Sequence, residues 1–420
     1  MIADAIHPAL PNVQINGPIP DSGKPWRAAL AALLLATTLP CSPPARAEGL
    51  DLTTTARLLA GIDPGGNDPA IAAITSGDSW QQHRKAARAG DRQLKIRLEK
   101  IDAWQKKVLV DLHRPNLLYP FSGPDFINAY AMFPDADTYV FFSLEPPGEV
   151  PKLDRLSPEQ LAGLFQDLRS ALNDLVALNF FITPNMKEDL QTGSLQGTVP
   201  VLLAMMGLLD LHVDAVDNYD PWPEKTRVYR KAAEQAAAAS ADKGAVSGQS
   251  LAKSAPPVRH PDLLGQGVRI TFTNPRNDHR QTLIYLALDV SDHELRFYPG
   301  FVKWMDSFEH PAVLLKSASY LLHGEHFRAV RRELLANADV IVEDDTGLPY
   351  KMIKDRGFDI SLFGQYEQPV KLFEGRYQGD LDAAYALAGN TEPLPFPFGY
   401  NWRKGGKSGL LLAQRVASTH

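Results

Sequence analysis

The chain has 420 residues and carries 43 Lys and Arg against 49 Asp and Glu, for a net charge of −6. This mild acidity excludes the basic footprint of a protein that binds nucleic acid or anionic membranes. The hydrophobic fraction, 44%, is ordinary for a globular protein, and a chain of this length can bury a sufficient core without cross-links.

Residues 24–47 predict a secretory signal peptide, with residues 1–23 as an extended leader. Lys24 and Arg27 precede an apolar run over 28–39, helix-breaking prolines follow, and Ala45-Arg46-Ala47 forms a small-x-small cleavage site. The apolar run is too short to serve as a membrane anchor, and no later run approaches about 20 apolar residues. We therefore expect cleavage after Ala47 and a periplasmic or secreted protein without a transmembrane span.

The single cysteine, Cys41, lies inside the predicted signal peptide, so the mature chain is cysteine-free. Such a chain has no disulfide, no thiol nucleophile, no thiolate zinc site and no iron–sulfur cluster. Lipidation of Cys41 is an alternative, but Leu39-Pro40 before the cysteine is a poor lipidation context.

The part over 48–228 is predicted to be rich in helix. An apolar stripe at helical spacing predicts a long helix over about 79–112, and Ser157-Pro158-Glu159-Gln160 is typical of a helix start. The β-branched and aromatic run 138–144 predicts a strand that is buried on both faces. The remaining segments are predicted to be an aromatic loop over 115–134 and a buried helix or strand over 197–211.

Residues 229–262 are rich in Ala, Ser, Gly, Lys and Pro and predict a flexible linker or insertion. The part over 263–420 is expected to combine helices and strands. Its predicted elements are a hairpin across 274–277, helices over 311–322 and 327–335, and strands near 340–342, 360–363 and 410–412. This order predicts an α+β fold, with a helix-rich N-terminal part packed against a mixed, mainly antiparallel, β-rich C-terminal part.

Three aspartates are candidate catalytic residues: Asp125, Asp344 and Asp345. Asp344 and Asp345 follow a predicted strand, where adjacent carboxylates can hold a cation or share a proton. The alternative for this pair is a turn over 344–347 in which Asp caps backbone N–H groups. The alternative for Asp125 is a buried loop in which it caps the next helix through Asn128.

His323 and His326 are candidate metal ligands in the segment Leu321-Leu322-His323-Gly324-Glu325-His326. Two imidazoles three residues apart can share one face of a helix, with a carboxylate beside them. The pattern is not a zinc-protease motif, and Gly324 favours a helix end with exposed histidines. A divalent cation is therefore an open alternative rather than an expectation.

The loop 119–126 is the candidate ligand-binding segment, with Tyr119, Phe121 and Phe126 as its aromatic residues. Prolines and aromatic rings can present polar groups inside an apolar pocket, and we expect this loop to be exposed. Ser122 lacks the glycine pattern of a hydrolase nucleophile, so we give it no catalytic role. Lys316 and Tyr320 lie on the predicted helix 311–322, where a snorkelling lysine and a tyrosine at the edge of the core are expected.

Five phrases carry a resemblance: YPFSGPDF at 119–126, SLEPPG at 143–148, LLKSASYLLH at 314–323, EDDTGLPY at 343–350 and FPFGYNW at 396–402. Together they resemble a group of uncharacterised secreted proteins of Gram-negative bacteria. The resemblance covers most of the mature chain and implies a location in the cell envelope. It implies no activity and transfers no catalytic residue.

The sequence thus contains no complete catalytic constellation. We expect a protein that binds a small molecule or an envelope partner. Two alternatives remain: a periplasmic hydrolase, metal-assisted or not, that uses Asp and His side chains, and a non-catalytic scaffold of the envelope.

Overall fold

The computed structural model describes residues 49–178, 194–222, 266–298, 300–317, 320–366, 369, 371–399 and 408–416. The predicted signal peptide and the predicted linker 229–262 lie outside these ranges. The segment Ala47–His420 forms one compact unit. In the described part of this unit, no helix is both long and apolar enough to cross a membrane.

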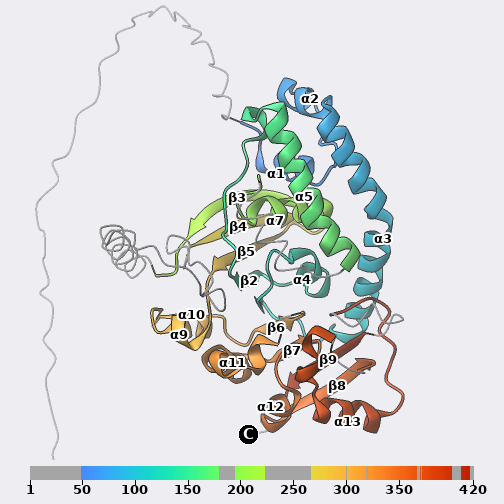
Figure 1. Cartoon of the computed structure of the whole chain (residues 1–420), viewed down its shortest axis with the longest axis vertical. Helices are drawn as coiled ribbons and strands as arrows, with labels where there is room; N and C mark the ends of the chain where they lie inside the picture. The colour runs from blue at the N-terminus through green and yellow to red at the C-terminus, as the bar shows by residue number, and fades with distance from the viewer. Residues whose placement is uncertain are drawn as a thin grey trace, which may run out of the picture. The chain divides into compact units, whose positions relative to one another are not determined.

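One mixed sheet organises the described residues, with the strand order β3-β4-β5-β2-β1-β6-β7-β9-β8 (Figure 1). The five central strands, from β5 to β7, are parallel, and antiparallel pairs extend the sheet at both ends. The strands are β1 Asn116–Pro120, β2 Thr138–Ser143, β3 His212–Tyr219, β4 Gly267–Asn274, β5 His279–Ala287, β6 Ala312–Leu315, β7 Val340–Glu343, β8 Phe358–Gly364 and β9 Gly409–Arg415.

The central strands are buried on both faces, as predicted for 138–144. In β2, Tyr139 and Phe141 point into one apolar core, whereas Val140 and Phe142 point into a second core on the other face. Because side chains alternate along a strand, an uninterrupted apolar run suits a strand with a core on each side.

Helices cover both faces of the sheet. The first core is closed by α1 Leu52–Leu59, α2 Pro69–Thr75, α3 Asp78–Val108, α4 Phe126–Met132, α5 Pro158–Leu178 and α7 Val199–Leu208. The second core is closed by α9 Asp292–Leu295, α10 Phe301–Asp306, α11 Arg328–Asn337, α12 Tyr350–Asp355 and α13 Gly379–Ala388. Single turns of 3₁₀ helix lie at η1 Leu153–Arg155, η2 Leu321–His323 and η3 Glu325–Phe327, with a kinked one at η4 Lys371–Arg376.

The predicted α+β class is confirmed: most of the helix lies in the N-terminal part, and the pairings within the C-terminal part are mostly antiparallel. The hairpin β4–β5 and the helix α11 also match the predicted segments. Both parts contribute to one sheet, because β1 and β2 lie between β5 and β6.

Two local predictions were wrong. Residues 312–315 of the predicted helix 311–322 form strand β6, and the predicted loop 115–134 contains strand β1 and helix α4. A short apolar run such as Ala312–Leu315 suits a buried strand and a buried helix equally well, so only its neighbours in the sheet decide between them.

The predicted helix start at Ser157 is confirmed, and it is a reciprocal capping box. The Gln160 backbone N–H donates to Ser157 Oγ at 3.3 Å, and the Ser157 backbone N–H donates to Gln160 Oε1 at 2.8 Å. We expect Ser157→Ala to lower the free energy of unfolding by about 1 kcal/mol. Urea unfolding would measure this loss, and Ser157→Thr, which keeps the hydroxyl, should retain most of the stability.

Candidate functional site

The predicted aspartates meet at one edge of the sheet, where the parallel strands end. Asp125 follows β1, Lys316 follows β6, and Asp344 and Asp345 follow β7. The direction in which the chain builds the sheet reverses at β1, since β2 and β5 lie to one side while β6 and β7 lie to the other. Ligands of open α/β sheets commonly bind outside the carboxyl ends of the strands at such a switch point.

A buried ion pair between the residues that follow β1 and β6 lies at this switch point. Lys316 Nζ lies 2.9 Å from Asp125 Oδ2, and the two side chains are only 1% and 3% exposed. Asp125 also accepts hydrogen bonds from Tyr119 Oη at 2.9 Å and from Asn128 Nδ2 at 2.7 Å. The predicted link between Asp125 and Asn128 is therefore present, but the expected snorkelling of Lys316 is wrong, since this lysine is paired inside the protein.

A second cation acts on the same carboxylate. Burial lowers the pKa of Arg97 on α3, and the charge of Asp125 partly offsets that effect. Asp125 thus lies within electrostatic range of two buried basic side chains.

Asp344 forms the predicted turn and also ties β7 to the loop after β6. Its Oδ1 accepts from the Thr346 backbone N–H at 2.9 Å, and its Oδ2 accepts from the Ser317 backbone N–H at 3.0 Å. The backbone of Gly399, in the left-handed region at φ +68°, packs directly on Asp344, because a Cβ there would lie 2.1 Å from Oδ2. Asp344 is therefore enclosed by three chain segments.

Asp345 accepts a hydrogen bond from the hydroxyl of Tyr320, whose ring lies edge-on to His323 with 5.1 Å between the ring centroids. Burial, together with the charge of Asp344, raises the pKa of Asp345 to about 7. Burial also raises the pKa of Glu343 well above its usual range, and raises that of Asp344 against the hydrogen bonds it accepts. These three neighbouring carboxyls therefore hold protons that exposed carboxyls would have lost.

A small enclosed cavity of about 10 Å³ lies against these carboxyls. That volume is about what one water molecule requires. Its lining includes the polar residues Glu343, Asp344, Asp345, Tyr350, Tyr366 and Gln378 together with Leu381 and Leu411.

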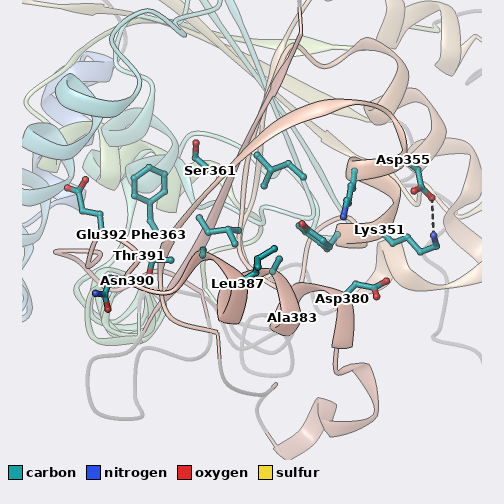
Figure 2. Close-up of a pocket in the computed structure, with 16 residues that line it drawn as sticks. Lys351, Asp355, Ser361, Phe363, Asp380, Ala383, Leu387, Asn390, Thr391 and Glu392 are labelled. Atoms are coloured by element: carbon teal, nitrogen blue, oxygen red, sulfur yellow. Dashed lines mark ion pairs between the residues drawn. The ribbon is translucent and has the colours of Figure 1, made fainter.

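A much larger, open groove is drawn in Figure 2, and Tyr350 is one of the residues that line it. It has a volume of about 820 Å³ between α12, the edge strand β8 and α13. Leu387 and Phe363 give it apolar surface, and an ion pair of 3.4 Å between Lys351 and Asp355 forms part of its rim. Tyr350 lines both the groove and the small cavity, so it stands between open surface and the buried carboxyls.

The expected exposed aromatic loop at 119–126 is wrong. Tyr119 and Phe126 are 1% and 0% exposed and belong to the core beneath the sheet, because β1 and α4 bury this segment. Phe121, at φ +58°, packs edge-on against Phe327 at 5.8 Å. Tyr119 still contributes to the site, because its hydroxyl donates a hydrogen bond to Asp125, but its ring is not available to contact a ligand.

The two histidines have different environments. Burial lowers the pKa of His323 to about 4, so its imidazole is neutral at pH 7, whereas His326 is exposed. Among the described residues, no group of three or more His, Cys, Asp or Glu side chains is placed to hold a metal ion.

Sequence reasoning missed the role of three residues, namely Lys316 as the partner of Asp125, and Tyr350 and Gln378 as walls of the cavity. Only Lys316 carried a signal, as a lysine in an otherwise apolar segment.

The five sequence phrases quoted above all lie at this edge of the sheet. Four of them begin within the last residues of β1, β2, β6 or β7, and the fifth, 396–402, contacts Asp344 through Gly399. No family model matches the chain, and neither a curated protein nor a solved structure is significantly similar to it.

Proposed function

We propose that the protein is a periplasmic or secreted binding protein whose ligand is a small organic cation. The location rests on the signal-peptide pattern over 24–47. The ligand class rests on one observation: Glu343, Asp344 and Asp345 are all buried beside a water-sized cavity.

Burial favours the protonated form of these carboxyls, because a charge is costly away from water. A primary ammonium group is about the size of a water molecule, so it fits the volume of the cavity. It donates three hydrogen bonds, and the carboxyl groups of Glu343, Asp344 and Asp345 in the lining are possible acceptors. The rest of the ligand would lie in the groove that Tyr350 also lines. Binding of a cation would then displace the proton of Asp345 into solution.

Titration calorimetry with 1,4-diaminobutane tests this proposal. We expect binding with release of protons at pH 7, seen as a dependence of the measured heat on the ionisation enthalpy of the buffer. The neutral analogue 1,4-butanediol should not bind. Asp345→Asn should weaken diamine binding at least tenfold, and the exposed control Asp359→Asn should not change it. Equal affinity for the diol, or full affinity in Asp345→Asn, would overturn the proposal.

A hydrolase is the second candidate, and the pKa of Asp345 favours it. A carboxyl with a pKa of about 7 that accepts a hydrogen bond from Tyr320, whose ring in turn contacts His323, suits a general base. Chromogenic esters, phosphates and glycosides would test this reading. Turnover by the wild type that disappears in the Asp344→Ala, His323→Ala double variant would support it, and turnover that persists in that variant would sink it.

A further inference from the structure

A second cavity lies among helices α1, α3, α5 and α7. Its volume is about 450 Å³, which is within the range of small-molecule sites. Helix α3 lies beside α5 (Figure 1) and contributes the small residues Ala86, Ala87 and Gly90, which leave the space open. Leu94, Leu172 and Leu208 give the cavity apolar walls.

His83 on α3 lines this cavity and is only 1% exposed. Its Nε2 lies 2.8 Å from the Leu59 carbonyl oxygen, so Nε2 carries the proton and donates it. The ring stacks on Phe165 at 4.7 Å, with 12° between the planes, which fixes its orientation. Burial lowers its pKa to about 4, so the imidazole is neutral at pH 7 and Nδ1 keeps its lone pair.

Nδ1 of His83 has no hydrogen-bond partner among the described residues. A buried acceptor without a donor destabilises the folded state, so such groups generally have a partner in the working protein. Sequence reasoning missed this residue, because a histidine three residues after Trp80 follows the apolar stripe of α3 like any core residue.

Arg169 on α5 lines the same cavity. Its Nη1 is buried and likewise has no hydrogen-bond partner in the described part of the chain. The positive charge of Arg169 contributes to the low pKa of His83, which places the two side chains within electrostatic range. The cavity thus presents one cationic donor and one neutral acceptor beside its apolar walls. Asp91 and Gln93 also line it, and the carboxylate of Asp91 is paired with Lys95 at 2.8 Å.

We propose that this cavity binds an amphiphilic carboxylate that also carries a hydroxyl or amide N–H group. The carboxylate would accept from Arg169, since guanidinium–carboxylate hydrogen bonds are the strongest available to it. An ionised carboxylate has no proton to give to Nδ1 of His83, so a separate donor on the ligand is required. The hydrocarbon part would pack against the leucine and alanine side chains.

Three ligands of matched chain length test this site on the wild-type protein by titration calorimetry: 3-hydroxydecanoate, decanoate and methyl 3-hydroxydecanoate. We expect the hydroxy acid to bind most tightly. Loss of the hydroxyl should weaken binding about five- to tenfold, and loss of the charge at least tenfold. Equal binding of all three ligands, or no binding of the hydroxy acid, would overturn the proposal without any variant.

Two variants then assign the contacts. Arg169→Gln should bring the hydroxy acid close to the affinity of its ester, and the exposed Arg356→Gln should leave the series unchanged. His83→Phe removes the Nδ1 acceptor while keeping a planar ring that can stack on Phe165, so it should abolish the preference for the hydroxyl. Asp345→Asn should not affect these ligands, which separates this site from the proposed cation site. Retention of the full wild-type pattern in both cavity variants would contradict the assignment.

Discussion

Replacing Lys316 by Met should lower the free energy of unfolding by about 3–5 kcal/mol, the usual cost of removing one partner from a buried ion pair. The lysine side chain is 1% exposed, and its loss leaves Asp125, 3% exposed, without the cation at 2.9 Å. The hydrogen bonds from Tyr119 and Asn128 remain but do not supply a charge. Urea unfolding followed by fluorescence and circular dichroism measures the change.

The double variant Asp125→Asn, Lys316→Met should recover part of this loss, because it removes both charges of the ion pair. The recovery should be incomplete, because buried Arg97 then loses the nearby charge of Asp125. The surface pair Lys351–Asp355 is the matched control. Its side chains are 69% and 62% exposed, and Lys351→Met should cost no more than about 1 kcal/mol. A loss in Lys316→Met as small as in this control would show that Asp125 does not depend on its partner.

The elements that were predicted correctly are those whose structure depends on residues close together in the sequence. The capping box at Ser157 and Gln160 and the apolar run of β2 depend on contacts within a few residues, and the structure has both. Strand β6 was predicted as helix because its four apolar residues suit either structure. Only their pairing with β1 on one side and β7 on the other makes them a strand. Strand order is set by contacts between distant parts of the chain, which local periodicity does not encode.

The site was predicted in pieces but not as a whole. Asp125, Asp344 and Asp345 were each chosen for the motif around them, and the parallel order of β1, β6 and β7 is what brings them to one edge. The pairing of Lys316 with Asp125 follows from that order, so no spacing in the sequence indicates it. Burial was the other missing quantity, because it turns an ordinary turn aspartate into a group with a pKa of about 7.

Asp345 should make the folded protein less stable as the pH rises from about 4 to about 7. Its pKa is about 7 in the folded protein, against about 3.9 in an unfolded chain. The folded state binds more protons over this interval, so the free energy of unfolding falls with rising pH. A shift of roughly three pKa units corresponds to at most about 4 kcal/mol. The pKa values of Glu343 and Asp344 are also raised, so these two carboxyls likewise lower the free energy of unfolding as the pH rises.

Asp345→Asn isolates this contribution, because Asn does not ionise and still accepts the hydrogen bond from Tyr320. His83 and His323, with pKa values lowered to about 4, act with the opposite sign below about pH 6.5, but they are present in both proteins and cancel in the difference. The stability of the wild type relative to the variant should therefore decrease between pH 4 and 8, whereas Asp359→Asn, at an exposed carboxyl, should give a flat difference. A flat difference for Asp345→Asn would mean that this carboxyl ionises as it would in water, and the proton release expected on diamine binding would lose its source.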